Sequence, residues 1–207
     1  MMVSSPLILR YSGNDNGEIA RQIAGFINKG FLAVIPTDTV YGVAADPNNV
    51  HAVEKLYTAK GREKKKPVPL LASDLKAVID YGARMSEPEL KVGKKLWPGA
   101  LTLVLEADGI QEGFRIPDCE ITREVLSLCG GVLRVTSANV SGEEPALAAD
   151  DAIRTIGSSV AVVLDAGRTL GGTASTVARI EGEKVEILRH GPIGAEEIIR
   201  AISGKGN

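Results

Sequence analysis

Five of the seven residues from Lys60 to Lys66 have basic side chains, and this cluster is the clearest candidate for chemistry in the sequence. The chain as a whole has a formal net charge of -2, so the cluster concentrates positive charge in one place. Arginine presents a planar fork of donors and lysine a compact ammonium, and both bind phosphates. The cluster therefore indicates an anionic ligand, although a solvated surface loop explains these residues equally well.

Two other segments are rich in hydroxyl side chains, and each follows an apolar run that predicts a strand. Thr37-Asp38-Thr39 follows Phe31–Ile35, and residues 136–142 (TSANVSG) follow Val132–Val135. Ligands of open α/β sheets bind beyond the carboxyl ends of strands, and we expect Thr37-Asp38-Thr39 to be exposed there. Such turns supply donors and acceptors for a nucleotide or an amino acid, but they also occur for conformational reasons alone.

The sequence contains neither a GxxxxGK[ST] loop nor a GxGxxG motif after a strand, so any ATP site has to be built in another way. The sequence contexts of His51 and His190 mark neither residue as a general base. Gly171-Gly172 either brings backbone amides close to a phosphate or forms a flexible turn. On its own, Arg189 is interpreted as an exposed cation at the end of a strand.

Length and composition predict an ordinary globular protein. The 207 residues are 44% hydrophobic and 24% charged, and we expect one domain over residues 1–207. Cys119 and Cys129 lack the spacing of a metal site. We therefore expect both cysteines to act as small buried apolar residues in a reducing compartment, and we expect no metal bound by the protein. Neither a signal peptide nor a window of about 18 apolar residues is present, which predicts a cytoplasmic protein with no membrane association.

Hydrophobic periodicity predicts an α/β fold with a mixed parallel and antiparallel sheet flanked by helices. Helices are expected over residues 19–27, 49–61, 74–81, 86–97, 121–128, 148–156 and 196–202. Strands are expected over residues 7–9, 31–35, 68–72, 101–105, 113–117, 132–135, 160–164 and 184–188, and a loop at residues 171–172 is expected to precede residues 175–178.

Eight short motifs, in order and spanning nearly the whole chain, resemble those of the YrdC family, the threonylcarbamoyl-AMP synthases. They are PTDTVYG (36–42), KGR (60–62), Pro67 with Leu70, WPG (97–99) with Leu101-Thr102, RIP (115–117), TSANVSG (136–142), STV (175–177) and LRHG (188–191). The resemblance implies a single-domain, short form of the enzyme that converts L-threonine, bicarbonate or CO2, and ATP into L-threonylcarbamoyl-AMP and pyrophosphate. It also implies a twisted sheet around a concave, positively charged surface.

The resemblance assigns roles to individual residues. It implies threonine contacts at Thr39, Arg115 and Ser137. It implies ATP contacts at Lys60, Arg62, Lys66, Asn139, Ser175 and Arg189. Lys60 and Arg62 would act by electrostatic stabilisation of the triphosphate, and Mg2+ is expected on the phosphates. The product would feed the threonylcarbamoyl-transfer machinery that modifies tRNA.

The sequence departs from the family pattern at two positions. Glu63 replaces the proline usual after the KGR motif, and Leu147 replaces a serine or threonine, which removes a hydroxyl contact to ATP. The alternative function is a paralogue that binds double-stranded RNA or tRNA on its basic face without making the adenylate. The net charge of -2 counts mildly against this alternative.

Overall fold

The structure, a computed structural model, describes residues 5–13, 17–61, 63 and 66–204. The strands in this part of the chain are β1 (Leu7–Arg10), β2 (Ala33–Ile35), β3 (Gly42–Ala45), β4 (Leu70–Ala72), β5 (Ala83–Arg84), β6 (Leu101–Ala107), β7 (Ile110–Arg115), β8 (Val132–Ser137), β9 (Val162–Asp165), β10 (Thr176–Glu181) and β11 (Lys184–Arg189). The helices are α1 (Glu18–Ile27), α2 (Val50–Lys60), α3 (Leu75–Asp80), α4 (Glu87–Leu96), α5 (Glu120–Leu128), α6 (Ala149–Ile156), the 3-10 helix η1 (Gly157–Ser159) and α7 (Ala195–Ser203).

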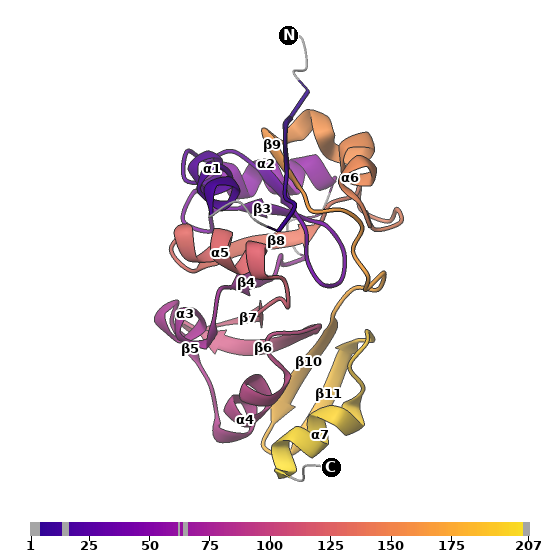
Figure 1. The fold of residues 1–207 in the computed structure, drawn as a ribbon. Helices are drawn as coiled ribbons and strands as arrows, with labels where there is room; N and C mark the ends of the chain where they lie inside the picture. The colour runs from indigo at the N-terminus through magenta and orange to yellow at the C-terminus, as the bar shows by residue number, and fades with distance from the viewer. Residues whose placement is uncertain (1–4, 14–16, 62, 64–65, 205–207) are drawn as a thin grey trace.

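The strands form one mixed sheet, as the sequence predicts. Its order is β1-β9-β2-β3-β8-β4-β7-β6-β10-β11, and β5 pairs with β6 beside this path. The pairs β1–β9, β2–β9, β4–β7 and β6–β10 are parallel, and the other pairs are antiparallel. In Figure 1, α1, α2, α5 and α6 lie around the upper part of the sheet, and α3, α4 and α7 lie around the lower part.

Apolar side chains pack in three clusters that fix these elements together. One joins β6, β10, α4 and α7, a second joins β2 and β3 to α2 and α6, and a third places α1 and α5 against β2, β8 and β9. Because the first cluster belongs to the lower part of the sheet and the others to the upper part, the strands β8, β4 and β7 connect separately packed regions (Figure 1).

Local sequence signals position several helix ends. Asn49 caps α2 by accepting from Ala52 N, and Gly61 ends the same helix in the left-handed conformation, at φ 58°. Ser86 and Glu89 form a capping box at the start of α4, at the first residue of the helix predicted over 86–97. None of the helices in the described ranges has the length and hydropathy of a membrane span.

The sheet differs from the sequence-based prediction in several places, including the unpredicted short strand β5. Strand β3 was not expected, because Gly42-Val43-Ala44-Ala45 has little strand propensity and is ordered by its pairing with β2 and β8. Strand β7 starts at Ile110 rather than 113, because Asp108 and Gly109, both with positive φ, form a tight hairpin turn after β6. Strand β8 continues to Ser137, two residues into the segment predicted as a turn.

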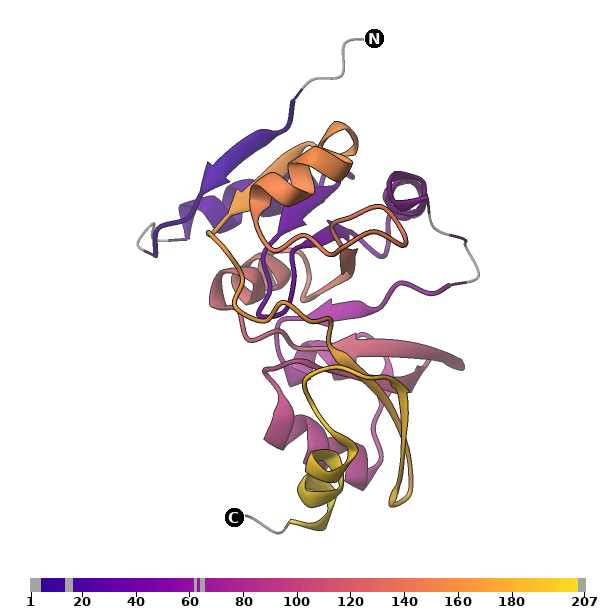
Figure 2. The ribbon, with the colours of Figure 1, turned by 90° about the vertical axis from the view of Figure 1, so that its right-hand side faces the viewer.

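A long connection of residues 166–175, which we call the strap, joins β9 to β10. Figure 2 shows this segment running from the upper part of the molecule to the lower part. The strap lies outside every helix and strand. Its hydrogen bonds to Thr37 O and Thr39 O place it beside the edge of the sheet where β2 and β8 end and β3 begins.

Candidate functional site

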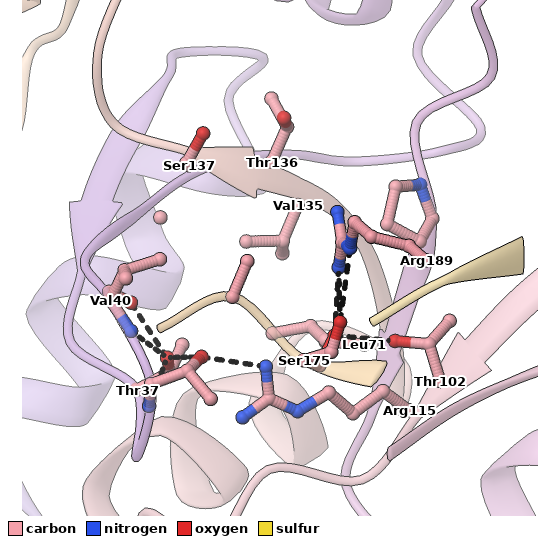
Figure 3. A pocket seen from close by; sticks show the side chains of 14 residues that line it. Thr37, Val40, Leu71, Thr102, Arg115, Val135, Thr136, Ser137, Ser175 and Arg189 are labelled. Atoms are coloured by element: carbon pink, nitrogen blue, oxygen red, sulfur yellow. Dashed lines mark hydrogen bonds between the residues drawn. The ribbon is translucent and has the colours of Figure 1, made fainter. Parts of the chain in front are cut away.

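A pocket of about 130 Å³ lies where the two hydroxyl-rich segments and the strap meet strands β3, β4, β6, β7 and β11 (Figure 3). We call it the Thr39 pocket. Its lining consists of Thr37, Thr39, Val40, Gly42, Pro69, Leu71, Thr102, Arg115, Val135, Thr136, Ser137, Ala174, Ser175 and Arg189. Hydroxyl groups and two arginines face apolar side chains, which is the composition expected of a small-ligand site.

Strand register explains why these distant residues meet. Gly42 pairs with Ile35 on one side and with Ser137 on the other, so both hydroxyl-rich segments lie at the same edge of the sheet. A Cβ at Gly42 would lie 2.5 Å from Val135 Cγ1, so the pairing depends on glycine. Leu71 pairs with Arg115, which brings β7 to the same place.

Arg115 is the most buried charge of the pocket, with 5% of its surface exposed. Its Nε donates to Gly99 O at 2.9 Å, Nη1 donates to Thr39 Oγ1 at 2.8 Å, and Nη2 forms an ion pair with Asp38. Burial lowers the pKa of Arg115, and the neighbouring Asp38 carboxylate opposes this effect. These three bonds use three of the five N–H groups, and one N–H remains on each terminal nitrogen.

Ser137 and Asn139 are held by a buried lysine. Lys60 Nζ donates to the backbone and side-chain oxygens of both residues, at 2.6 and 3.2 Å for Ser137 and at 2.5 and 3.1 Å for Asn139. Only 2% of Lys60 is exposed, although the sequence places it in a cationic cluster. The end of α2 and the segment after β8 are therefore joined by a charged group.

On the opposite side of the pocket, Ser175 joins three strands. Its Oγ lies 2.8 Å from Thr102 Oγ1 on β6, and it accepts from Arg189 Nη2 at 3.0 Å. Arg189 also donates twice to Ser175 O, at 3.0 and 2.8 Å. Figure 3 shows Arg189 and Thr102 both directed at Ser175.

The strap is attached directly to the turn that presents Thr39. Thr169 Oγ1 donates to Thr37 O at 2.9 Å, and Gly172 N donates to Thr39 O at 3.0 Å. A Cβ at Gly171 would lie 2.3 Å from Asp38 O, so only glycine permits this approach. The glycine pair consequently packs on backbone, and the Gly172 amide already has a partner.

Tyr41 attaches the start of the strap. Its hydroxyl donates to Gly167 O at 2.5 Å and accepts from Ala166 N at 3.2 Å. Burial raises the pKa of Tyr41 to about 12, so the phenol is a neutral structural group at ordinary pH.

The profile of the Sua5/YciO/YrdC family, described as telomere recombination, matches residues 25–191. The chain belongs to this family. The match includes every residue that lines the Thr39 pocket, from Thr37 to Arg189.

Relatives of this Sua5/YciO/YrdC chain carry the name threonylcarbamoyl-AMP synthase. A Mycobacterium tuberculosis protein with that name, given provisionally, is 35% identical over 192 residues, which cover 86% of each chain. The Bacillus subtilis protein named threonylcarbamoyl-AMP synthase is 30% identical over 188 residues. These cover 86% of the present chain and 54% of the Bacillus protein, so the chain spans about half of that relative.

Solved structures agree with this assignment. Pyrococcus abyssi Sua5 complexed with L-threonine is 28% identical, with a TM-score of 0.88 over 96% of this chain and 61% of that one. Escherichia coli YciO has a TM-score of 0.82 over 94% of this chain and 99% of that one, but at 19% identity it supports the fold alone.

The structure brings most residues implied by the family resemblance to one place. Thr39, Arg115, Ser137, Ser175 and Arg189 all line the Thr39 pocket. Lys60 and Asn139 are joined to it through Ser137.

Of the other two cationic residues of the prediction, one does not line the pocket and the other lies outside the part of the chain that the structure describes. Lys66 lies exposed between α2 and β4, and Tyr57 Oη approaches its carbonyl at 3.4 Å. Arg62 lies outside the described residues. His51 and His190 are both exposed and do not belong to the lining of the pocket. Among the described residues, no group of three or more His, Cys, Asp or Glu side chains is arranged to bind a metal.

The prediction that the Thr37–Thr39 turn is exposed was wrong. Thr37 is 7% exposed and Thr39 only 1%, because the strap covers the turn. Sequence reasoning also missed Asp38 and Thr102 as partners of site residues. Asp38 lies inside the PTDTVYG motif, but nothing local indicates that it pairs with an arginine 77 positions away.

Proposed function

We propose that the chain is an L-threonylcarbamoyladenylate synthase, a nucleotidyltransferase that uses L-threonine, bicarbonate or CO2, and ATP. The observation that carries the proposal is Arg115, a buried arginine in a pocket of about 130 Å³ that also presents hydroxyls, and its bonds to the described residues use three of its five N–H groups. A guanidinium binds a carboxylate well, and the hydroxyls suit the other polar groups of a small amino acid. Threonine contacts are assigned to Thr39, Arg115 and Ser137.

The reaction has two steps, and the second brings two anions together, a carbamate and the triphosphate of ATP. The threonine amine attacks the carbon of CO2, an N–C bond forms as one C=O π bond opens and its electron pair moves to oxygen, and the nitrogen loses a proton to give a carbamate. A carbamate oxygen then attacks the α-phosphorus of ATP, and the bond from that phosphorus to pyrophosphate breaks. Positive charge near the phosphates offsets repulsion between carbamate and triphosphate and stabilises the leaving group.

We assign ATP to the rim of the pocket, because the volume of the pocket suits an amino acid and leaves no room for a nucleotide beside it. The ATP contacts are assigned to Lys60, Arg62, Lys66, Asn139, Ser175 and Arg189. Lys60 and Arg62 supply the charge that stabilises pyrophosphate. The contact between Lys60 and Asn139, which is also assigned to ATP, supports the assignment of Lys60 to the ATP side of the pocket. We expect Mg2+ to be held mainly by the phosphates, since it retains waters and uses few protein ligands.

The proposal extends to the setting of the reaction. Residues 1–207 act as one domain in the cytoplasm, with a concave positive surface around the pocket, and a transferase that modifies tRNA consumes the product. The RNA-binding alternative is less well supported, because contacts to an RNA backbone do not require a buried arginine in an amino-acid-sized pocket. Binding to RNA without any binding of threonine would favour that alternative.

Calorimetric titration with L-threonine tests the assignment of the pocket. We expect saturable binding by the parent protein and at least tenfold weaker binding by Arg115→Gln. Arg84→Gln is the control, because Arg84 is exposed and its Nη1 lies 3.7 Å from Glu106 Oε1. No threonine binding by the parent protein would contradict the proposal.

A further inference from the structure

Residues 60–66, which we call the cationic segment, are flanked by two attachments to strand β8. At the start of the segment, Lys60 Nζ donates to Ser137 O at 2.6 Å. Just beyond its end, Arg134 Nη1 donates to Val68 O at 2.8 Å. Arg134 and Ser137 lie three residues apart on β8, which is about 10 Å along a strand. One rigid strand therefore holds the chain on both sides of the segment.

Both attachments adjoin the Thr39 pocket. Ser137 lines the pocket, and Figure 3 shows it at the end of β8. Pro69, which directly follows Val68, lines the pocket as well. The cationic segment consequently begins and ends beside the pocket, on the rim to which ATP is assigned.

Strand pairing alone does not reach the segment. The ladder between β4 and β8 extends to Pro69, whose carbonyl accepts from Val135 N at 3.0 Å. Proline has no N–H, so Pro67 and Pro69 cannot donate to a ladder. Arg134 carries the attachment one residue further, to Val68 O, by means of its side chain.

Glu112 fixes the orientation of Arg134. Glu112 Oε1 accepts from Nη2 at 2.5 Å, and Oε2 accepts from Nη1 at 3.1 Å. The second N–H of Nη1 then serves Val68 O. The hydrogen bond to Glu112 raises the pKa of Arg134, so the guanidinium stays charged and its charge is balanced by the carboxylate. Arg134 thus orients the backbone without adding net charge to the rim.

Tyr57 on α2 provides a further contact to the segment. Its Oη lies 3.4 Å from Lys66 O, and Lys66 N donates to Glu63 O at 3.0 Å. The Tyr57 contact is long for a hydrogen bond, so we expect it to matter less than the bond from Arg134. Like the bond from Arg134, it is made to a backbone carbonyl and uses no cation of the segment.

We propose that Arg134, oriented by Glu112 and assisted by Tyr57, is a positioning residue that fixes the cationic segment beside the pocket for the triphosphate of a nucleotide. The inference rests on the proposed function, which assigns ATP to this rim. Five of the seven residues in the segment are basic and repel one another, so an attachment outside the segment is needed to hold them together. In the described part of the chain, the residues that line the pocket do not include Arg134.

Calorimetric titrations with MgATP, AMP and L-threonine test the inference. We expect the double variant Arg134→Met with Glu112→Met to bind MgATP about tenfold more weakly and to bind AMP and threonine within twofold of the parent. AMP lacks the two phosphates that the segment serves, whereas general damage to the pocket would weaken all three ligands. Replacing both partners leaves no buried charge unpaired, so the double variant should fold.

A matched ion pair serves as the control. Arg179 Nη1 lies 3.3 Å from Glu186 Oε2 on β10 and β11, away from the segment. Arg179→Met with Glu186→Met should change none of the three affinities. Tyr57→Phe should weaken MgATP about threefold and leave AMP unchanged, because the hydroxyl contact to Lys66 O is lost.

Limited digestion with trypsin reports on the segment without any ligand. Trypsin cleaves after lysine and arginine, and we expect cleavage within residues 60–66 to be about fivefold faster in the Arg134→Met, Glu112→Met variant than in the parent. Cleavage elsewhere in the chain should keep its rate. An unchanged rate within the segment would count against the attachment.

Each remaining outcome decides between the two proposals. Equal weakening of MgATP and AMP, or no weakening of either, would overturn the inference, and Tyr57→Phe decides if the double variant fails to fold. If the parent binds no MgATP, the proposed function and the inference both fail. If the parent binds MgATP but releases pyrophosphate without threonine or bicarbonate, the proposed function fails, and the inference holds only if the variants still separate MgATP from AMP.

Discussion

Lys60 and Asn139 are separated by 79 positions, yet the Lys60 ammonium donates to both oxygens of Asn139, at 2.5 and 3.1 Å. Two further bonds to Ser137 give the ammonium four oxygen acceptors for its three protons, so every Lys60 proton has an acceptor within the protein and at least one proton is shared. The structure therefore gives Lys60 a stabilising role in addition to the electrostatic role proposed for it.

Replacement of Lys60 tests both roles. Lys60→Met leaves buried oxygens of Ser137 and Asn139 without their donor, so we expect a loss of about 1–3 kcal/mol in the free energy of unfolding. Most of the pyrophosphate release should be lost as well. Lys55→Met is the control on the same helix, because Lys55 is exposed and its Nζ lies 6.0 Å from the Phe31 ring centroid. Urea unfolding should separate the variants, and equal stability would contradict the role of Lys60 in joining α2 to β8.

The strap offers a matched pair of glycines. At Gly171 an added Cβ would lie 2.3 Å from Asp38 O and 2.7 Å from Thr39 Cα, so Gly171→Ala has to displace the strap or the turn. We expect at least tenfold weaker binding of threonine by calorimetry. Gly172 has φ +67° and nothing within 4 Å of an added Cβ. Gly172→Ala should therefore cost about 1 kcal/mol of stability through backbone strain and leave binding nearly intact. Equal effects on binding would mean that the contact at Gly171 is unimportant.

Tyr41 predicts a stability difference that depends on pH. Its pKa is about 12 in the folded protein and about 10 when unfolded, so the folded state retains the proton longer. The stabilisation is complete below pH 10 and is lost as the pH rises from 10 through 12, by about 1.4 kcal/mol per pH unit. Tyr41→Phe should be less stable than the parent at pH 8, because Gly167 O and Ala166 N lose their partner.

Urea unfolding of both proteins from pH 8 to 11 measures this effect. Cys129 contributes its own slope, since burial raises its pKa to about 12, but that slope is common to both proteins. The parent should therefore lose its advantage over Tyr41→Phe above pH 10. A difference that stays constant over this range would contradict the assignment.

The ion pair of Arg134 and Glu112 should stabilise the joint between β8 and β7. Its side chains are only 19% and 11% exposed, and Arg134 Nη1 also donates to Val68 O at 2.8 Å. Removal of one partner leaves a buried charge unpaired, so Glu112→Ala should lower the free energy of unfolding by about 3 kcal/mol. Glu186→Ala is the control, since the Arg179–Glu186 pair is largely exposed and should be worth less than about 1 kcal/mol. Comparable losses would show that burial does not decide the value of the pair.

The fold was predictable where the signal is local. The capping box at Ser86 and Glu89 and the glycine at the end of α2 lie where the sequence indicates. Strand β3 was not predictable, because its small residues acquire strand geometry only from β2 and β8.

The candidate site was also predictable only where the signal is local. The hydroxyl-rich segments and Arg115 were found from motifs, and the pocket contains them. The partners that orient them, Asp38 and Lys60, depend on contacts across 77 to 79 positions that no local pattern encodes. The burial of the Thr37–Thr39 turn was missed for this reason, because the strap that covers it comes from the far end of the chain.

The most direct test of the proposed function is pyrophosphate release by the purified protein in the presence of ATP and Mg2+, with L-threonine and bicarbonate supplied together, singly or not at all. The account predicts release only when both are present, formation of L-threonylcarbamoyl-AMP in equal amount, and loss of both in Arg115→Gln. Release that continues without threonine or without bicarbonate, or no release with all substrates present, would contradict it.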